Sequence, residues 1–172
     1  GRSESGFLFS GFHVESQKSV VLRLFERRKS SAADRDGWNR AKRLQKLESP
    51  HLVPIIAVGD VEGLAYIAQE RVPGWTIPDL LKGVRQKGCV GMEEKAALAI
   101  AEGVARGLIA IHDAAFVHGH VRPELVVIPH GASHREAHAE VPKELLASRL
   151  VSLSLLSNDK NGDPFAAPEV VS

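Results

Sequence analysis

The segment that decides the fold of this chain is Val117-His118-Gly119-His120-Val121-Arg122-Pro123-Glu124-Leu125-Val126-Val127. It lies within Val117–Ile128, which we predict to be a short apolar strand. The residues before it, Glu93–Ala114, have the three- and four-residue spacing of a long helix. We expect one stripe of that helix to carry Leu98, Ala101, Ala105, Leu108 and His112. After it, a polar segment with helical character from Glu136 to Ala147 precedes a second short apolar strand, Leu150–Leu155.

The N-terminal half has mostly the pattern of strands. We predict a hairpin from Phe7–Phe12 and Ser19–Phe25, turning at residues 16–18, and a second pair from Leu52–Val58 and Ala65–Glu70, turning at Glu62-Gly63. A helix is predicted between these pairs over Ala32–Leu47, with Trp38, Ala41, Leu44 and Leu47 on one face, and Ser49-Pro50 ends it. A short helix, Thr76–Lys87, follows with Pro78 in its first turn. This order predicts an α+β fold, with a small β-rich lobe followed by a mainly helical lobe.

Composition sets the general class of the protein. The 172 residues fit one domain or part of a larger one, and 44% apolar with 25% charged residues is ordinary for a globular protein. A net charge of +1 favours neither nucleic acid nor a membrane surface as a partner. Cys89 alone forms no intrachain disulfide, and no apolar run reaches the roughly 18–20 residues of a membrane span, so we expect a cytoplasmic domain. Because the first residue is Gly rather than Met, we expect a piece of a longer protein, with any tether outside this chain.

The central segment resembles the catalytic loop V-H-R-D-L-K-P-E-N-I-L of eukaryotic-type protein kinases, as found in bacterial Ser/Thr kinases. His118, Pro123 and Glu124 match it. The changed positions are Gly119 for the arginine, His120 for the catalytic aspartate, Arg122 for the lysine and Leu125 for the metal-binding asparagine. Residues 149–155 resemble K-L-I-D-F-G-L with Ser152 in place of the metal-binding aspartate, and Ala167-Pro168-Glu169 matches A-P-E.

The same resemblance extends through the N-terminal half and implies a nucleotide pocket. Residues 1–8 lie over the glycine-rich loop G-x-G-x-x-G-x-V, and residues 20–23 lie over V-A-I-K. Gln69 would be the gatekeeper, and Glu70 and Val72 would offer backbone groups to an adenine. The residues implied for this pocket are Gly1, Ser3, Gly6, Leu8, Val21, Arg23, Arg40, Gln69, Glu70, Val72, Arg122 and Val127.

The changed positions predict a domain without kinase activity. Arg23 and Arg40 would replace the Lys–Glu ion pair, and two like charges cannot form it. Leu125 offers no oxygen to Mg²⁺ and Ser152 offers only a neutral hydroxyl, so we expect no metal site and no ATP or Mg²⁺ cofactor. Apolar positions of the resembled core are retained at Leu8, Val21, Leu44, Val127 and Leu153. We therefore expect a catalytically inactive pseudokinase that serves as a regulatory or protein-interaction scaffold.

The expected organisation is a small lobe over residues 1–72 and a partial large lobe over residues 73–172. The large lobe would contain an insertion at about residues 129–148 and end just after the A-P-E motif. The helices that follow in a kinase would be missing, so we expect an exposed apolar surface on Glu93–Ala114 that a protein partner or a second copy covers. Residues 152–169 are short for an activation segment, and Gly119 lacks the arginine that receives a phosphorylated loop, so we expect no switching by loop phosphorylation.

Three alternatives stay open at this point. Arg23, Arg40 and Arg122 favour a sensor that binds a nucleotide or another anion without metal. His120 as a base would favour a residual Ser/Thr kinase. His134 and His138, four residues apart and near His130, have spacing that suits zinc, although a solvated helix is the preferred interpretation.

Overall fold

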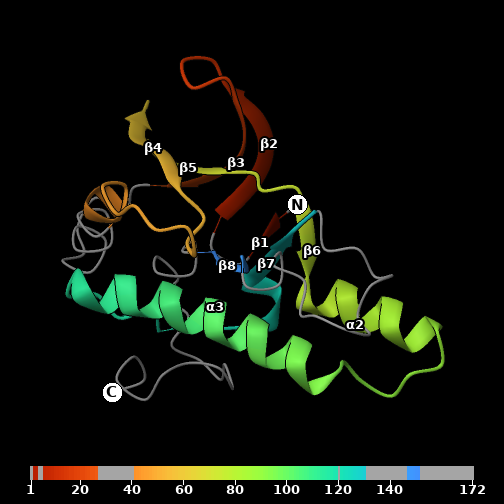
Figure 1. Cartoon of the computed structure of the whole chain (residues 1–172). Helices are drawn as coiled ribbons and strands as arrows, with labels where there is room; N and C mark the ends of the chain where they lie inside the picture. Colours follow the sequence, from red (N-terminus) through yellow and green to blue (C-terminus); the bar gives the residue numbers. More distant parts are fainter. Residues whose placement is uncertain (1, 4–5, 27–40, 120, 131–146, 152–172) are drawn as a thin grey trace.

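A computed structural model of the chain describes residues 2–3, 6–26, 41–119, 121–130 and 147–151. Figure 1 shows a five-stranded sheet above, two helices below, and a small three-stranded sheet between them. In this described part, no helix is long and apolar enough to cross a membrane. The predicted helix at residues 136–147 and the zinc-like histidines at 134 and 138 lie outside the described residues, except for residue 147, which is in a turn.

The larger sheet is antiparallel and has the order β1-β2-β3-β5-β4. Its strands are β1 (Arg2–Ser3), β2 (Gly6–His13), β3 (Lys18–Glu26), β4 (Ile55–Val61) and β5 (Leu64–Glu70). Both predicted hairpins are confirmed, although β4 begins later than expected. The backbone of Glu62 and Gly63 has positive φ, as the tight turns of hairpins require.

The predicted helix between the two hairpins is described only at its end. Residues 41–44 are helical, and Ala41 and Leu44 are buried, as their spacing predicts. The turn at Pro50 follows. Residues 27–40, which include Trp38 and Arg40, lie outside the described residues.

The two predicted helices of the C-terminal part are confirmed. Helix α2 spans Ile77–Gln86 and α3 spans Glu94–Asp113. Helix α2 begins with a capping box, in which Thr76 and Asp79 each bind the backbone N–H of the other.

The predicted stripe of α3 lies mostly on the exposed side of the helix. Leu98, Ala101, Ala105 and His112 are exposed and Leu108 is half-buried. The helix instead buries Ala99, Ile100, Gly103, Gly107 and Ile111. The physical reason is close packing, since a Cβ on Gly107 would lie 2.7 Å from the backbone oxygen of His51. The small residues face the core because only they let that segment approach the helix.

The smaller sheet has the order β6-β7-β8 and is built from β6 (Gly74–Thr76), β7 (Val126–Pro129) and β8 (Arg149–Leu150). The predicted strand Val117–Ile128 is too long at its N-terminal end. Within it, Pro123–Leu125 form the short 3₁₀ helix η1, and pairing with β6 begins only at Val127. Proline starts a helical turn readily because it lacks an N–H that the first turn would leave unbonded. For Leu150–Leu155, strand structure is described only at residues 149–150.

One apolar core joins both sheets and α3. It contains Leu52, Ile67, Ile100, Ile128 and Leu150, all no more than 4% exposed. Leu44 is in this cluster, as predicted, but Leu8 is 38% exposed and does not belong to the core. Leu8 sits on β2 next to the edge of the sheet, where only β1 lies beyond it, so little protein covers its side chain. Val21 and Val127 are half-buried, and Leu153 lies outside the described residues.

Candidate functional site

The register of the larger sheet brings four of the predicted pocket residues to one face. Leu8 pairs with Arg23, and Val21 pairs with Gln69 across the next strand. Residues two apart on a strand point to the same side, and paired residues share that side. Leu8, Val21, Arg23 and Gln69 therefore lie on a common face, as the resemblance implies for a nucleotide pocket.

Arg23 is a buried cation within this face. Only 7% of the residue is exposed, and burial lowers the pKa of its guanidinium. Arginine nevertheless stays protonated near neutral pH, because its ordinary pKa is above about 12. Arg40, the predicted partner position, lies outside the described residues, so the expected pair of arginines remains a prediction.

The gatekeeper position is filled by a side chain that bonds to the backbone of a neighbouring segment. Gln69 is 1% exposed, and its Nε2 donates to the carbonyl oxygen of Val53 at 3.0 Å. The backbone N–H of Glu70 donates to Pro54 O at 2.9 Å, and its carboxylate binds Lys18 Nζ at 2.7 Å. Val72 is half-buried two residues further on. The hinge-like segment is therefore fixed to Val53 and Pro54, which directly precede β4.

The segment that resembles the kinase catalytic loop is anchored through His118. His118 is 2% exposed, and its Nε2 donates to Val151 O at 3.2 Å. The Val151 N–H donates to Leu125 O at 2.8 Å. These bonds hold residue 151, which precedes Ser152, against the loop. His118 packs in the interior, as the resemblance predicts.

Leu125 packs against the apolar core at the position where the resemblance places a metal-binding asparagine. Its aliphatic side chain has no lone pair for a hard cation. Arg122 is half-buried next to η1, and Val127 is half-buried between Thr76 and Arg149.

The remaining predicted site residues are described in part or not at all. Ser3 and Gly6 pair across β1 and β2, which fixes the backbone of the glycine-rich-loop-like segment at these two positions. Gly1, Arg40, His120 and Ser152 lie outside the described residues.

Sequence reasoning missed two features of the site. The first is Gly119, whose φ is +77°, in the left-handed region that side chains disfavour. The second is a backbone link between His51–Val53 and residues 148–151, in which Leu52 forms a parallel bridge with Leu150. Val53 N–H donates to Leu150 O at 3.0 Å, and Leu150 N–H donates to His51 O at 2.9 Å. The glycine in the loop motif could have indicated the left-handed backbone at Gly119. The link between residues 51–53 and 148–151 leaves no local signal in the sequence.

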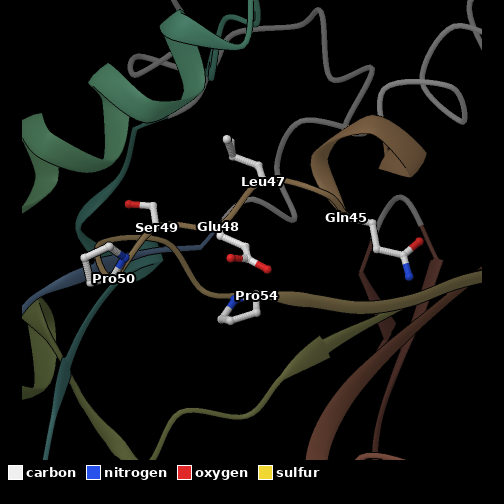
Figure 2. A pocket seen from close by; sticks show the side chains of 6 residues that line it. All are labelled: Gln45, Leu47, Glu48, Ser49, Pro50 and Pro54. Atoms are coloured by element: carbon white, nitrogen blue, oxygen red, sulfur yellow. The ribbon is translucent and has the colours of Figure 1, made fainter.

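A groove lies beside this link, at the end of the helical residues 41–44. Figure 2 shows the six residues that line it, and its volume is about 420 Å³. They are Gln45, Leu47, Glu48, Ser49, Pro50 and Pro54. Among these six described residues, Glu48 is the one with an ionisable side chain.

Comparisons with known proteins agree with this geometry. No protein-family model matches the chain. It is 28% identical over 130 residues to the serine/threonine-protein kinase PknE of Mycobacterium bovis, which covers 74% of this chain and 22% of PknE. It is 30% identical over 88 residues to the probable serine/threonine-protein kinase CPE1738 of Clostridium perfringens, which covers 51% of this chain and 12% of that protein. The chain thus spans less than a quarter of the length of these relatives.

Solved structures show the same fold. The kinase domain of Mycobacterium tuberculosis PknI matches 92% of this chain and 58% of its own, with a TM-score of 0.68 and 18% identity. Rad53 residues 1–466, in complex with AMP-PNP, matches 99% of this chain and 40% of its own, with a TM-score of 0.69 and 21% identity. The kinase relatives, the kinase-domain fold and the α+β architecture together place the chain in the protein-kinase-like superfamily.

Proposed function

We propose that this chain is a catalytically inactive kinase-like domain that works as a protein-interaction scaffold. Two residues support the loss of catalysis. Leu125 has an apolar side chain that packs with the core where a metal ligand would be needed. Gly119 has a left-handed backbone where the motif has arginine. The replacements His120 and Ser152 add to this from the sequence. An absent metal ligand removes the charge neutralisation on which phosphoryl transfer depends.

The observation that carries the scaffold role is the exposed apolar stripe of α3. It consists of Leu98, Ala101, Ala105 and Ile109, on the side opposite to the buried face. Leu98 is 62% exposed and Ile109 is 57% exposed. Covering a leucine or isoleucine fully is worth about 1.5–3 kcal/mol, so a protein surface placed here would gain appreciable binding energy.

Light scattering on the chain alone tests this proposal. We expect self-association through the stripe, and the double variant Leu98→Glu/Ile109→Glu should give a monomer. Val90→Glu is the matched control, because Val90 is an apolar residue that is 97% exposed in a loop, and this variant should behave like the parent. A parent chain that is monomeric without any partner would contradict the proposal.

A second candidate function is a sensor that binds a nucleotide or another anion without metal. It is favoured by Arg23, which lies on the same face of the sheet as Leu8 and Val21. A buried guanidinium is a strong donor to phosphate oxygens. We propose that such binding would need no Mg²⁺ cofactor.

Thermal shift with ATP, with and without Mg²⁺, separates the candidates. A rise in Tm that is independent of Mg²⁺ and lost in Arg23→Met supports the sensor. No shift supports the scaffold alone. A Mg²⁺-dependent rise together with transfer of phosphate to a protein substrate would show a residual Ser/Thr kinase and overturn the main proposal.

A further inference from the structure

A groove between α2 and η1 lies apart from the exposed stripe of α3 and from the pocket face of the larger sheet. Its volume is about 530 Å³, within the roughly 300–1,000 Å³ of ligand sites. Figure 1 shows α2 leading away from the lower end of β6 on the right of the molecule, whereas the C-terminal end of α3 lies on the left. The groove is lined by Pro78, Leu81, Lys82, Arg85 and Gln86 of α2 and by Pro123 and Glu124 of η1.

The α2 residues of this groove form a face of their own. Positions 78, 81, 82, 85 and 86 follow the three- and four-residue spacing that aligns side chains along one side of a helix. The core contact of α2 comes from another side, where Leu80 is 6% exposed and Ile77 packs against the apolar cluster. Leu80 and Ile77 thus hold α2 against the apolar core, and the side chains of the groove face take no part in this contact.

The groove has an apolar half and a cationic half. Pro78, Leu81 and Pro123 supply the apolar half, while Lys82 and Arg85 are exposed on the α2 wall. Within the described residues, neither cation has a carboxylate at salt-bridge distance. The nearby carboxylate of Asp79 is bound instead to the hydroxyl of Thr76 at 2.6 Å, as part of the helix cap.

Glu124 lies on the opposite wall and is exposed. These charges orient an anionic ligand, because it is attracted to the cations of the α2 wall and repelled from Glu124 on the η1 wall. The groove therefore favours a ligand with apolar and anionic groups side by side, and its carboxylates on the α2 side.

We propose that this groove binds a short acidic peptide segment of a partner protein. An apolar side chain of the peptide packs on Leu81 between the two prolines, and its carboxylates pair with Lys82 and Arg85. A free anion would use only the two cations, and an apolar peptide would use only the prolines and Leu81. A peptide with both kinds of side chain uses the whole face and gains from both contacts.

Fluorescence anisotropy with a labelled leucine- and glutamate-containing hexapeptide tests the proposal. We expect binding by the parent chain, and a loss of about tenfold or more in affinity for Lys82→Glu/Arg85→Glu. Glu124→Gln should strengthen binding by about two- to threefold, because it removes the repelling charge. Lys46→Glu/Lys95→Glu is the charge-matched control at exposed positions away from the groove and should bind like the parent. Circular dichroism confirms that each variant is folded.

Three outcomes would overturn the proposal. One is equal binding of the peptide in which glutamine replaces every glutamate. Another is unchanged affinity in the Lys82/Arg85 variant. The third is binding of anionic phospholipid vesicles, dependent on the same two cations, without binding of the peptide. The acidic variant of the α3 stripe should keep its peptide affinity, so this test is independent of the scaffold test.

Discussion

Gly119 stands where the resembled motif has arginine, and its backbone has an unusual conformation. Its φ of +77° is readily adopted by glycine but strained for a residue with a side chain. The residue is also buried, next to His118, which anchors the loop through Val151. An arginine at this position, as in the motif of active kinases, would have to adopt the left-handed backbone and place a long cation at a buried site. The backbone conformation of this loop therefore disfavours an arginine at position 119.

Gly119→Arg should consequently destabilise the domain and restore no activity. The left-handed backbone alone costs about 1–2 kcal/mol for a residue with a side chain. The measurement is the free energy of unfolding from urea titration. Gly91→Arg is the control, because Gly91 has no atom near its missing Cβ and no positive φ, and should change stability little. Equal stability of the two variants would be inconsistent with a left-handed Gly119.

Helix α3 has two different apolar faces, and its glycines decide which one is buried. Gly107 allows the backbone of His51 to pack closely, and Leu98 and Ile109 lie on the outside. The helix therefore buries Ile100 and Ile111 together with small residues, while Leu98 and Ile109 lie on the surface that we propose as the scaffold contact. A helix built only to be a core element would place those large residues inward.

Alanine substitutions of two helical glycines should have opposite effects. Gly107→Ala places a Cβ 2.7 Å from His51 O and should destabilise the fold by about 1–3 kcal/mol, as overpacking does. Gly83→Ala in α2 meets no atom within 4 Å and should stabilise by up to about 1 kcal/mol, because alanine is the better helix former. Urea denaturation of both variants measures the difference. Stabilisation by both would show that α3 does not approach residue 51 closely.

The cap of α2 should give a pH-dependent contribution to stability. The hydroxyl of Thr76, and then its backbone N–H, lower the pKa of the Asp79 carboxyl by hydrogen bonding. A carboxyl whose pKa is lower in the folded state stabilises the fold above its unfolded pKa, and this stabilisation is lost as the pH falls through the folded pKa. Thr76→Ala should therefore cost about 1 kcal/mol at neutral pH.

That cost should shrink in acid, below the ordinary aspartate pKa of about 3.9, where Asp79 becomes protonated. Unfolding measured across this range, with Asp79→Asn as the control, checks the linkage. A cost of Thr76→Ala that stays constant down to the lowest pH would argue against coupling between the two side chains.

At the scale of the whole molecule, the two sheets are joined by the link between residues 51–53 and 148–151. The Leu52–Leu150 bridge lies within the apolar core, and Ser148, which is fully buried, donates its Oγ to Ile100 O in α3 at 3.1 Å. Arg43 adds a further contact, with its guanidinium carbon 4.6 Å from the centre of the Phe116 ring. Residues far apart in sequence are thereby held together.

Ser148→Ala should loosen this unit locally. Loss of one buried hydrogen bond costs about 0.5–1.5 kcal/mol. Hydrogen exchange should accelerate at the amides of Val53 and Leu150, which donate across the link, and remain unchanged in the β2–β3 hairpin. Acceleration of the same size in the hairpin would mean that the effect is global and that the link is not a separate element.

The sequence predicted the hairpins and both helices of the C-terminal part. It predicted them because strand alternation, helical spacing and turn residues act over a few neighbouring positions. It overestimated the strand before Val126, since Pro123 starts a 3₁₀ turn there. It also placed Leu8 in the core, although Leu8 lies on a strand near the sheet edge.

By itself, the sequence determined the order of elements and the kinase-like superfamily, and it places Leu125 where the resembled motif has asparagine. Only the tertiary structure decided which face of α3 is buried, that Leu52 pairs with Leu150, and that Gly119 has a left-handed backbone. The physical reason is that sequence patterns act between neighbouring residues, whereas these features depend on contacts between residues far apart in the chain. The apolar pattern of α3 fits either face, and the choice is made by the close approach of His51 to Gly107, more than fifty positions away along the chain.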